Sequence, residues 1–179
     1  MISIIGNELV KNKDYEINIL SVREKNKVPF FFFDDRIRRE TLKNNEKGGG
    51  ILDTILLLRK YVKSKKIDIL VVCNVASDII AIPATRFTET RLISWEHFGF
   101  SDNISNKWIK QARGLATKFS DYIIVLTKND EEEYRKKFNI SKKVKIVQIY
   151  NPIENEDYNE TIKNNKNILT IGHFAYVKG

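Results

Sequence analysis

Apolar residues along this chain recur with two spacings, one typical of helices and the other typical of short strands. The helical spacing predicts helices over residues 3–11, 51–66, 104–119 and 128–138. Short apolar runs predict strands over residues 16–22, 29–33, 67–73, 92–95, 122–126, 144–149 and 168–171. Residues 75–84 fit either a short helix or a loop that ends near Pro83. The alternation of strands and helices indicates an α/β fold with a mostly parallel sheet.

The same pattern predicts which side chains form the core. The inward stripe of helix 51–66 comprises Ile51, Ile55, Leu58 and Val62. The inward stripe of helix 104–119 comprises Trp108, Ile109, Ala112, Leu115 and Ala116. Residues 67–73 form a nearly continuous apolar run, as in parallel strands that are buried on both faces. We expect the aromatic run over residues 29–33 to be a buried strand as well.

Helix 128–138 has a start signal of its own. Thr127 is followed three residues later by Asp130, which is a capping-box arrangement. The acidic residues from Asp130 to Glu133 suit the positive end of a helix. We therefore expect these carboxylates to stabilise the helix.

Composition places the chain among folded proteins. It has 179 residues, of which 42% are hydrophobic, so it can bury a sizeable core. A single cysteine, Cys73, and two histidines exclude a disulfide framework and a thiolate metal cluster, and we expect no metal. No apolar run approaches the ~20 residues that span a bilayer. The first ten residues lack the basic start of a secretory signal, so we expect a soluble, cytoplasmic protein.

The pattern also predicts the domain organisation. Residues 1–153 form one α/β domain, whereas the acidic, Asn-rich residues 154–167 form a linker. Residues 168–179 supply one strand and one loop, and a single strand cannot make a domain. We therefore expect the chain to end just inside a second domain. It also begins with a helix, where doubly wound domains usually begin with a strand.

The net charge of +8 is concentrated in one stretch. Residues 36–66 contain ten basic and three acidic residues. Such a stretch suits peripheral contact with an anionic membrane, and the alternative is a solvated face that keeps the protein soluble. The only aromatic residue of this stretch is Tyr61, whereas RNA-binding surfaces stack bases on several aromatic side chains. We therefore expect no nucleic-acid partner.

Candidate chemistry lies in residues 93–98, which read ISWEHF and end a predicted strand. Open α/β sheets bind ligands at the carboxyl ends of their strands. His97 could donate a hydrogen bond to a hydroxyl or phosphate group, and Glu96 could orient it or act as a base. Alternatively, His97 satisfies a backbone carbonyl beside Trp95.

A second candidate is the loop from Gly172 to Gly179. A glycine at each end lets backbone amides approach a phosphate, and Lys178 adds positive charge. The loop is not a P-loop, because the Walker spacing and its Ser or Thr are absent.

Four segments in order resemble the family 4 glycosyltransferases of the GT-B fold. They are ISWEHF at 93–98, ARGLATKFSDYIIVLTKNDEEEYRKKF at 112–138, KIVQIYNPI at 145–153 and NILTIGHFAYVKG at 167–179. Residues 4–22 also resemble the first helix and second strand of that family's N-terminal domain. The resemblance implies a Rossmann-like, acceptor-side domain of a GT-B fold, with the first strand and most of the donor domain outside this chain.

The resemblance also implies an activity and its residues. The activity is retaining transfer of a sugar from a nucleotide sugar, which is a co-substrate, and no cofactor is implied. By position, His97 of the Glu96–His97 pair lies near the transferred sugar and the acceptor. Gly172 and Lys178 lie on the side of the donor diphosphate, and His173 stands where the family has an arginine.

The function that follows is a fragment of a glycosyltransferase that acts on a glycan or lipid-linked acceptor, in cell-surface polysaccharide synthesis, at the inner face of the membrane. The alternative is an acceptor-binding or membrane-binding subunit of a two-chain transferase. Because a GT-B active site lies between two domains, we expect this chain alone to be inactive.

Overall fold

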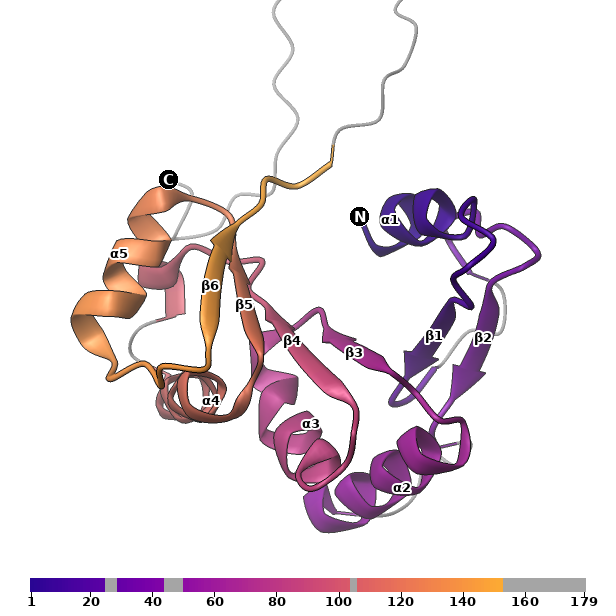
Figure 1. Ribbon diagram of the computed structural model, residues 1–179, viewed down its shortest axis with the longest axis horizontal. Helices are drawn as coiled ribbons and strands as arrows, with labels where there is room; N and C mark the ends of the chain where they lie inside the picture. The colour runs from indigo at the N-terminus through magenta and orange to yellow at the C-terminus, as the bar shows by residue number, and fades with distance from the viewer. Residues whose placement is uncertain (25–28, 44–49, 104–105, 153–179) are drawn as a thin grey trace, which may run out of the picture.

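The computed structural model describes residues 1–24, 29–43, 50–103 and 106–152, which form two parallel β-sheets with helices packed around them (Figure 1). The alternation predicted from the sequence is therefore confirmed. The predicted linker 154–167 and the strand 168–171 lie outside the described residues, so the predicted domain boundaries stay predictions.

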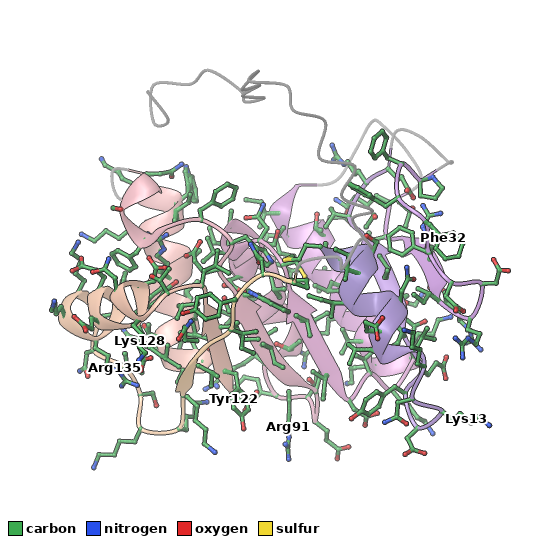
Figure 2. All side chains as sticks on the ribbon, turned by 90° about the horizontal axis from the view of Figure 1, so that it is seen from above. Lys13, Phe32, Arg91, Tyr122, Lys128 and Arg135 are labelled. Carbon is green, nitrogen blue, oxygen red and sulfur yellow. The ribbon has the colours of Figure 1, made fainter. Side chains whose placement is uncertain are left out.

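The larger sheet has four parallel strands in the order β3-β4-β5-β6. Their bounds are β3 Ile69–Val72, β4 Arg91–Trp95, β5 Tyr122–Val125 and β6 Lys145–Gln148. Each crossover of this sheet contains a helix, as is usual between parallel neighbours: α3 Asp78–Thr85, α4 Lys107–Phe119 and α5 Lys128–Lys137, with 3-10 turns at Val75–Ser77 and Phe100–Asn103. Arg91 and Tyr122, at the amino ends of β4 and β5, lie along the same edge of the molecule (Figure 2).

The smaller sheet pairs β1 (Asn18–Ser21) with β2 (Arg38–Thr41) in parallel. Helix α1 (Ile2–Leu9) packs on it, with Gly6 facing Ile37 and Ile19 of the smaller sheet region. Helix α2 (Ile51–Ser64) then leads back to β3 and packs against α3.

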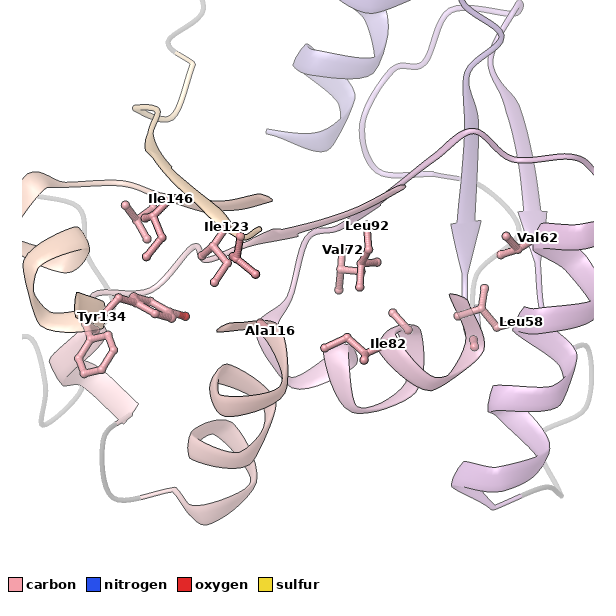
Figure 3. Close-up of a cluster of buried hydrophobic side chains, with 14 residues drawn as sticks. Leu58, Val62, Val72, Ile82, Leu92, Ala116, Ile123, Tyr134 and Ile146 are labelled. Atoms are coloured by element: carbon pink, nitrogen blue, oxygen red, sulfur yellow. The ribbon is translucent and has the colours of Figure 1, made fainter. Parts of the chain in front are cut away.

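The core lies between the larger sheet and the helices beneath it (Figure 3). Its labelled members are Leu58, Val62, Val72, Ile82, Leu92, Ala116, Ile123, Tyr134 and Ile146. Leu20 of β1 and Leu42, which directly follows β2, pack against this cluster as well. One continuous core thus joins both sheets.

The predicted strand at 29–33 is wrong. The second strand is β2, whose sequence is Arg-Arg-Glu-Thr, and the aromatic run precedes it as an irregular segment with exposed rings. Polar β2 is at the edge of its sheet, where charged side chains are favoured. Its arginines bind carboxylates nearby: Arg38 pairs with Glu16 and Arg39 with Glu24.

Some core predictions also differ from the structure. Leu58 and Val62 are buried as predicted, but Ile51 and Trp108 are 50% and 62% exposed because the first turns of α2 and α4 extend beyond the core. The run 67–73 is not buried on both faces, since Ile69 and Val71 are 54% and 41% exposed. Residues 75–84 are helical, and Pro83 lies within α3.

Candidate active site

The residues that follow β4 are at the carboxyl edge of the larger sheet. Strand β4 ends at Trp95, and the backbone N–H of Glu96 donates to the carbonyl of Ile124 at 2.9 Å, which continues the pairing with β5 by one residue. Asn151, three residues after β6, lies near His97 and influences its ionisation. The sheet therefore brings the segment after β4 together with the segment after β6, at the edge where parallel sheets bind ligands.

Glu96 lies inside a buried ion pair. Its side chain and that of Arg113 on α4 are each 2% exposed, and Arg113 Nε donates to Glu96 Oε2 at 2.8 Å. The hydroxyl of Tyr134 on α5 donates to the same oxygen at 3.1 Å. Burial raises the pKa of Tyr134 well above its ordinary value, so this hydroxyl keeps its proton. Glu96 thus ties the end of β4 to both following helices.

Arg113 also fixes the loop that follows the candidate site. Its NH1 group donates to the carbonyl of Phe100 at 2.8 Å, and the guanidinium carbon lies 4.4 Å from the centre of the Phe100 ring. From the other side, Asp130 Oδ1 accepts a hydrogen bond from the N–H of Phe100 at 2.8 Å. Both polar groups of the Phe100 backbone are therefore held by charged side chains.

Thr127 caps α5 as predicted, because its Oγ1 accepts from the N–H of Asp130 at 3.1 Å. The contacts of the Asp130 carboxylate differ from those in a capping box, where the carboxylate would accept a hydrogen bond from the Thr127 N–H. It accepts instead from the Thr127 hydroxyl, at 2.6 Å, and from Phe100. The cap of α5 therefore also positions the loop after β4.

His97 is half-buried and lies against Trp95, with ring centres 5.3 Å apart. Both of its ring nitrogens are buried, and neither has a partner at hydrogen-bonding distance among the described residues, although the Asn151 side chain lies close enough to act on the ring. Burial lowers the pKa of His97 below its ordinary value, and the Asn151 side chain acts in the opposite direction. The imidazole is therefore mostly neutral at pH 7, with one N–H donor and one nitrogen acceptor, both buried.

Asp78, in the first turn of α3, adds a second buried carboxyl beneath this edge. It accepts a short hydrogen bond from the hydroxyl of Ser94 on β4. Burial raises the pKa of Asp78 to about 8; the Ser94 hydrogen bond opposes this shift, and the charge of Glu96 adds to it. Asp78 is therefore mostly protonated at neutral pH.

Some polar atoms of the buried cluster lack hydrogen-bond partners. Asp78 Oδ1, Glu96 Oε1 and one Arg113 nitrogen are buried without a hydrogen-bond partner among the described residues. Buried groups of this kind normally bind water or a ligand. These atoms lie within the buried cluster under β4, where bound water could satisfy them.

Sequence reasoning placed Glu96 and His97 at this edge but did not connect them with Arg113, Tyr134 or Asp78. The structure joins Glu96 to Arg113, and no hydrogen bond links Glu96 to His97 in the described part of the chain. Arg113 carried a signal, because it lies beside the alanines of a predicted inward stripe, and a buried arginine needs a partner. Gly172, His173 and Lys178 lie outside the described residues.

Comparison with known proteins agrees with this architecture. The model of Glycosyltransferase Family 4 matches residues 5–157, a range that contains Glu96, His97 and Arg113. The chain belongs to glycosyltransferase family 4. It is also 29% identical, over 99% of its length, to an uncharacterized glycosyltransferase of Haemophilus influenzae, and it spans 45% of the length of that protein. Family 4 membership makes the chain part of a transferase family with an α/β, Rossmann-like fold, as the sequence predicted.

The described residues contain no cluster of three or more His, Cys, Asp and Glu side chains that could hold a metal ion. Within the same residues, every helix is too short or too polar to cross a bilayer.

Proposed function

We propose that this chain is the acceptor-side domain of a retaining glycosyltransferase. The enzyme moves a sugar from a nucleotide sugar to a glycan or lipid-linked acceptor, in cell-surface polysaccharide synthesis. The observation that carries the proposal is His97, a neutral imidazole with two unpartnered, buried ring nitrogens at the carboxyl edge of a family 4 sheet. A group of this kind is suited to hydroxyl groups of a sugar, which both donate and accept hydrogen bonds.

In the proposed reaction, His97 donates a hydrogen bond to a hydroxyl of the transferred sugar or the acceptor. Its environment is preorganised, since Trp95 packs against the ring and Glu96, the preceding residue, is locked to Arg113. Because the Glu96 carboxylate is committed to this buried ion pair, Glu96 is a positioning residue in the proposal. A fixed hydrogen-bond donor accelerates a reaction where it meets charge that develops in the transition state.

The donor side of the proposed site is supplied by residues beyond the described domain. We assign the diphosphate to the loop with Gly172, His173 and Lys178, and the rest of the donor site to a second domain. The relative from Haemophilus influenzae is about twice as long as this chain, so it has room for such a domain. No cofactor or metal takes part in the proposal.

We further propose that the domain works at the inner face of the membrane, drawn there by its net charge of +8. Several cations of the basic stretch are engaged in ion pairs, among them Arg36 with Asp34 and Lys65 with Glu40. Long-range attraction by the net charge is therefore a better basis for membrane contact than a patch of unpaired arginines.

The test compares two chains. The 179-residue chain and a longer chain that includes a second domain are each incubated with a panel of nucleotide sugars and a lipid-linked acceptor. We expect transfer with retained anomeric configuration from the longer chain alone, because the preorganised donor contacts are missing from the shorter one. Turnover by the 179-residue chain, or an inverted product, would contradict the proposal.

A further inference from the structure

An exposed aromatic segment lies between β1 and β2. Phe30, Phe31 and Phe32 are 94%, 58% and 78% exposed, and Phe32 lies at the periphery of the molecule (Figure 2). The rings of Phe30 and Phe31 meet edge to face with their centres 5.0 Å apart. Soluble proteins rarely leave contiguous apolar surface uncovered unless it meets a partner or a membrane. We therefore expect these three consecutive rings to contact a partner or a membrane.

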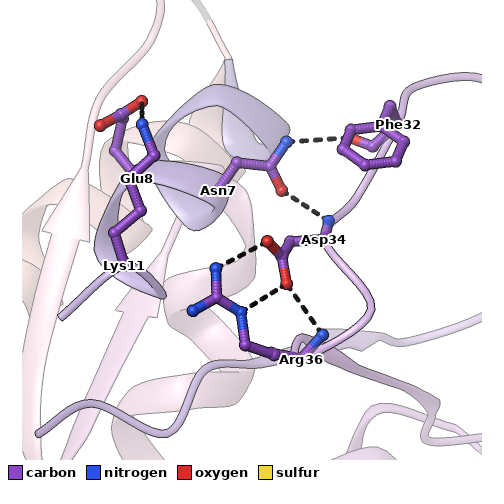
Figure 4. Close-up of polar contacts among 6 residues, drawn as sticks. All are labelled: Asn7, Glu8, Lys11, Phe32, Asp34 and Arg36. Atoms are coloured by element: carbon purple, nitrogen blue, oxygen red, sulfur yellow. Dashed lines mark hydrogen bonds and ion pairs between the residues drawn. The ribbon is translucent and has the colours of Figure 1, made fainter. Parts of the chain in front are cut away.

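The backbone beside the rings is fixed by hydrogen bonds (Figure 4). The side-chain amide of Asn7 on α1 donates to the carbonyl of Phe32 at 3.2 Å, and its oxygen accepts from the N–H of Asp34 at 2.9 Å. Arg36 binds the Asp34 carboxylate through two nitrogens, each at 2.8 Å. This guanidinium holds the pKa of Asp34 well below its usual range, so the pair persists across physiological pH.

The fourth ring behaves differently. Phe33 lies beneath the guanidinium of Arg39, which is 5.4 Å from the ring centre. One ring of the run is thus covered by its own domain, whereas the three before it are exposed, and the backbone is anchored at Phe32 and Asp34. The rings of Phe30, Phe31 and Phe32 are therefore exposed while the chain beside them is held in a defined conformation.

The charge of the chain favours an anionic partner for these rings. Arg36 and Arg38, which follow the rings along the chain, pair with Asp34 and Glu16, so the attraction comes from the net charge of +8 of the whole chain. Exposed aromatic rings on a cationic protein match a lipid interface, where the rings enter the boundary of the acyl region. An anionic leaflet adds attraction for a protein of this charge.

We propose that Phe30, Phe31 and Phe32 insert into the interfacial region of an anionic lipid bilayer and anchor the domain there. This inference rests on the proposed membrane location and deepens it by naming the side chains that enter the lipid. It requires neither donor nor acceptor, so vesicle binding tests it independently of sugar transfer.

The experiment uses the 179-residue chain with vesicles of phosphatidylcholine, with or without 30% phosphatidylglycerol. In a Phe31→Trp variant, insertion should shift the tryptophan emission to the blue when vesicles are added, by more than in wild type. Brominated lipids should quench the same emission. We expect both signals with the anionic vesicles only. The variant Phe30→Ser/Phe31→Ser/Phe32→Ser should bind these vesicles about a hundredfold more weakly, since each inserted ring contributes roughly a factor of five or more.

The matched control removes exposed apolar side chains elsewhere. Leu52 and Leu56 on α2 are 77% and 66% exposed, and Leu52→Ser/Leu56→Ser should keep vesicle binding within about twofold. Equal binding by the triple Phe variant, an unshifted Phe31→Trp spectrum, or loss of binding in the α2 control would each overturn the inference. A blue shift that depends on protein concentration without vesicles would also overturn it, in favour of a protein contact. Sugar transfer by the longer chain would remain a separate result in every case.

Discussion

Glu96 and Arg113 neutralise each other in a place where neither charge reaches water. Removing one partner of a buried pair leaves the other charge unpaired and desolvated, which typically costs more than the pair itself contributes. At this position the pair holds the end of β4, the loop at Phe100 and helix α4 in one arrangement. We infer that its task is to keep the backbone before His97 rigid.

The first prediction concerns this pair. Arg113→Ala should lower the free energy of unfolding by about 3–5 kcal/mol, because Glu96 is left buried without its counter-charge. The control is Lys110→Ala, an exposed position on the same helix, which should change it by less than about 0.5 kcal/mol. Urea unfolding followed by circular dichroism measures both, and equal stabilities of the two variants would refute the structural role of the pair.

The second prediction concerns the pH dependence caused by Asp78. Its pKa is raised to about 8 in the folded state, so between the unfolded and folded pKa values the folded protein holds one more proton. Stability from this group is therefore present at low pH and is lost as the pH rises toward 8. Asp78→Asn mimics the protonated acid and removes that loss.

Relative to wild type, Asp78→Asn should gain stability by about 1.4 kcal/mol for each pH unit between pH 6 and 7.5. Unfolding of both proteins in urea across this range gives the difference. A difference that stays constant with pH would show that Asp78 is ionised in the folded protein.

At the scale of residues, sequence reasoning identified the site residues that directly follow a strand. It missed the site residues that come from the helices packed against that strand. Glu96 and His97 were accessible to it because they directly follow a recognisable apolar run. Tyr134 is 38 residues away from Glu96 along the chain, and its contact depends on how α5 packs. A pattern of spacings along one segment carries no information on such a contact.

At the scale of elements, apolar periodicity located most helices and strands within a few residues. It failed where a strand lacks an apolar face: β2 consists of two arginines, a glutamate and a threonine, and is stabilised by pairing with β1 and by ion pairs. The neighbouring aromatic run had the composition of a strand. Its rings are exposed instead, because Asn7 and Arg36 fix the backbone around them.

The third prediction tests the coupling of α5 to the candidate site. Thr127→Ala should lower the free energy of unfolding by about 1–2 kcal/mol, since the N-cap bond to Asp130 is lost. It should also increase amide exchange at Phe100, because Asp130 then lacks the hydroxyl that orients it. The control is Lys128→Ala at the next position, which should leave the free energy of unfolding and the exchange rate at Phe100 unchanged. Equal exchange rates at Phe100 in the two variants would show that the cap of α5 does not position the loop.

At the scale of the whole molecule, one core joins a sheet that carries the candidate site to a smaller sheet that carries the exposed aromatic rings. This arrangement allows one domain to hold an acceptor at the carboxyl edge and contact lipid with a separate segment. The alternating order of elements was enough to predict an α/β fold, and four sequence segments in order identified the resemblance to family 4. The order of elements did not predict that Ile69 and Val71 of β3 and the aromatic run before β2 would be exposed, because exposure depends on what packs against each surface.

The central claim is that His97 contacts reacting groups, and the most direct test is the kcat/KM of His97→Ala in a longer chain that carries out transfer. Loss of one hydrogen bond made in the transition state should reduce kcat/KM by about 10²–10³-fold. The melting temperature should remain close to that of wild type, because neither ring nitrogen bonds to a described residue. A kcat/KM within a factor of about three of wild type would contradict the claim and make His97 a structural residue.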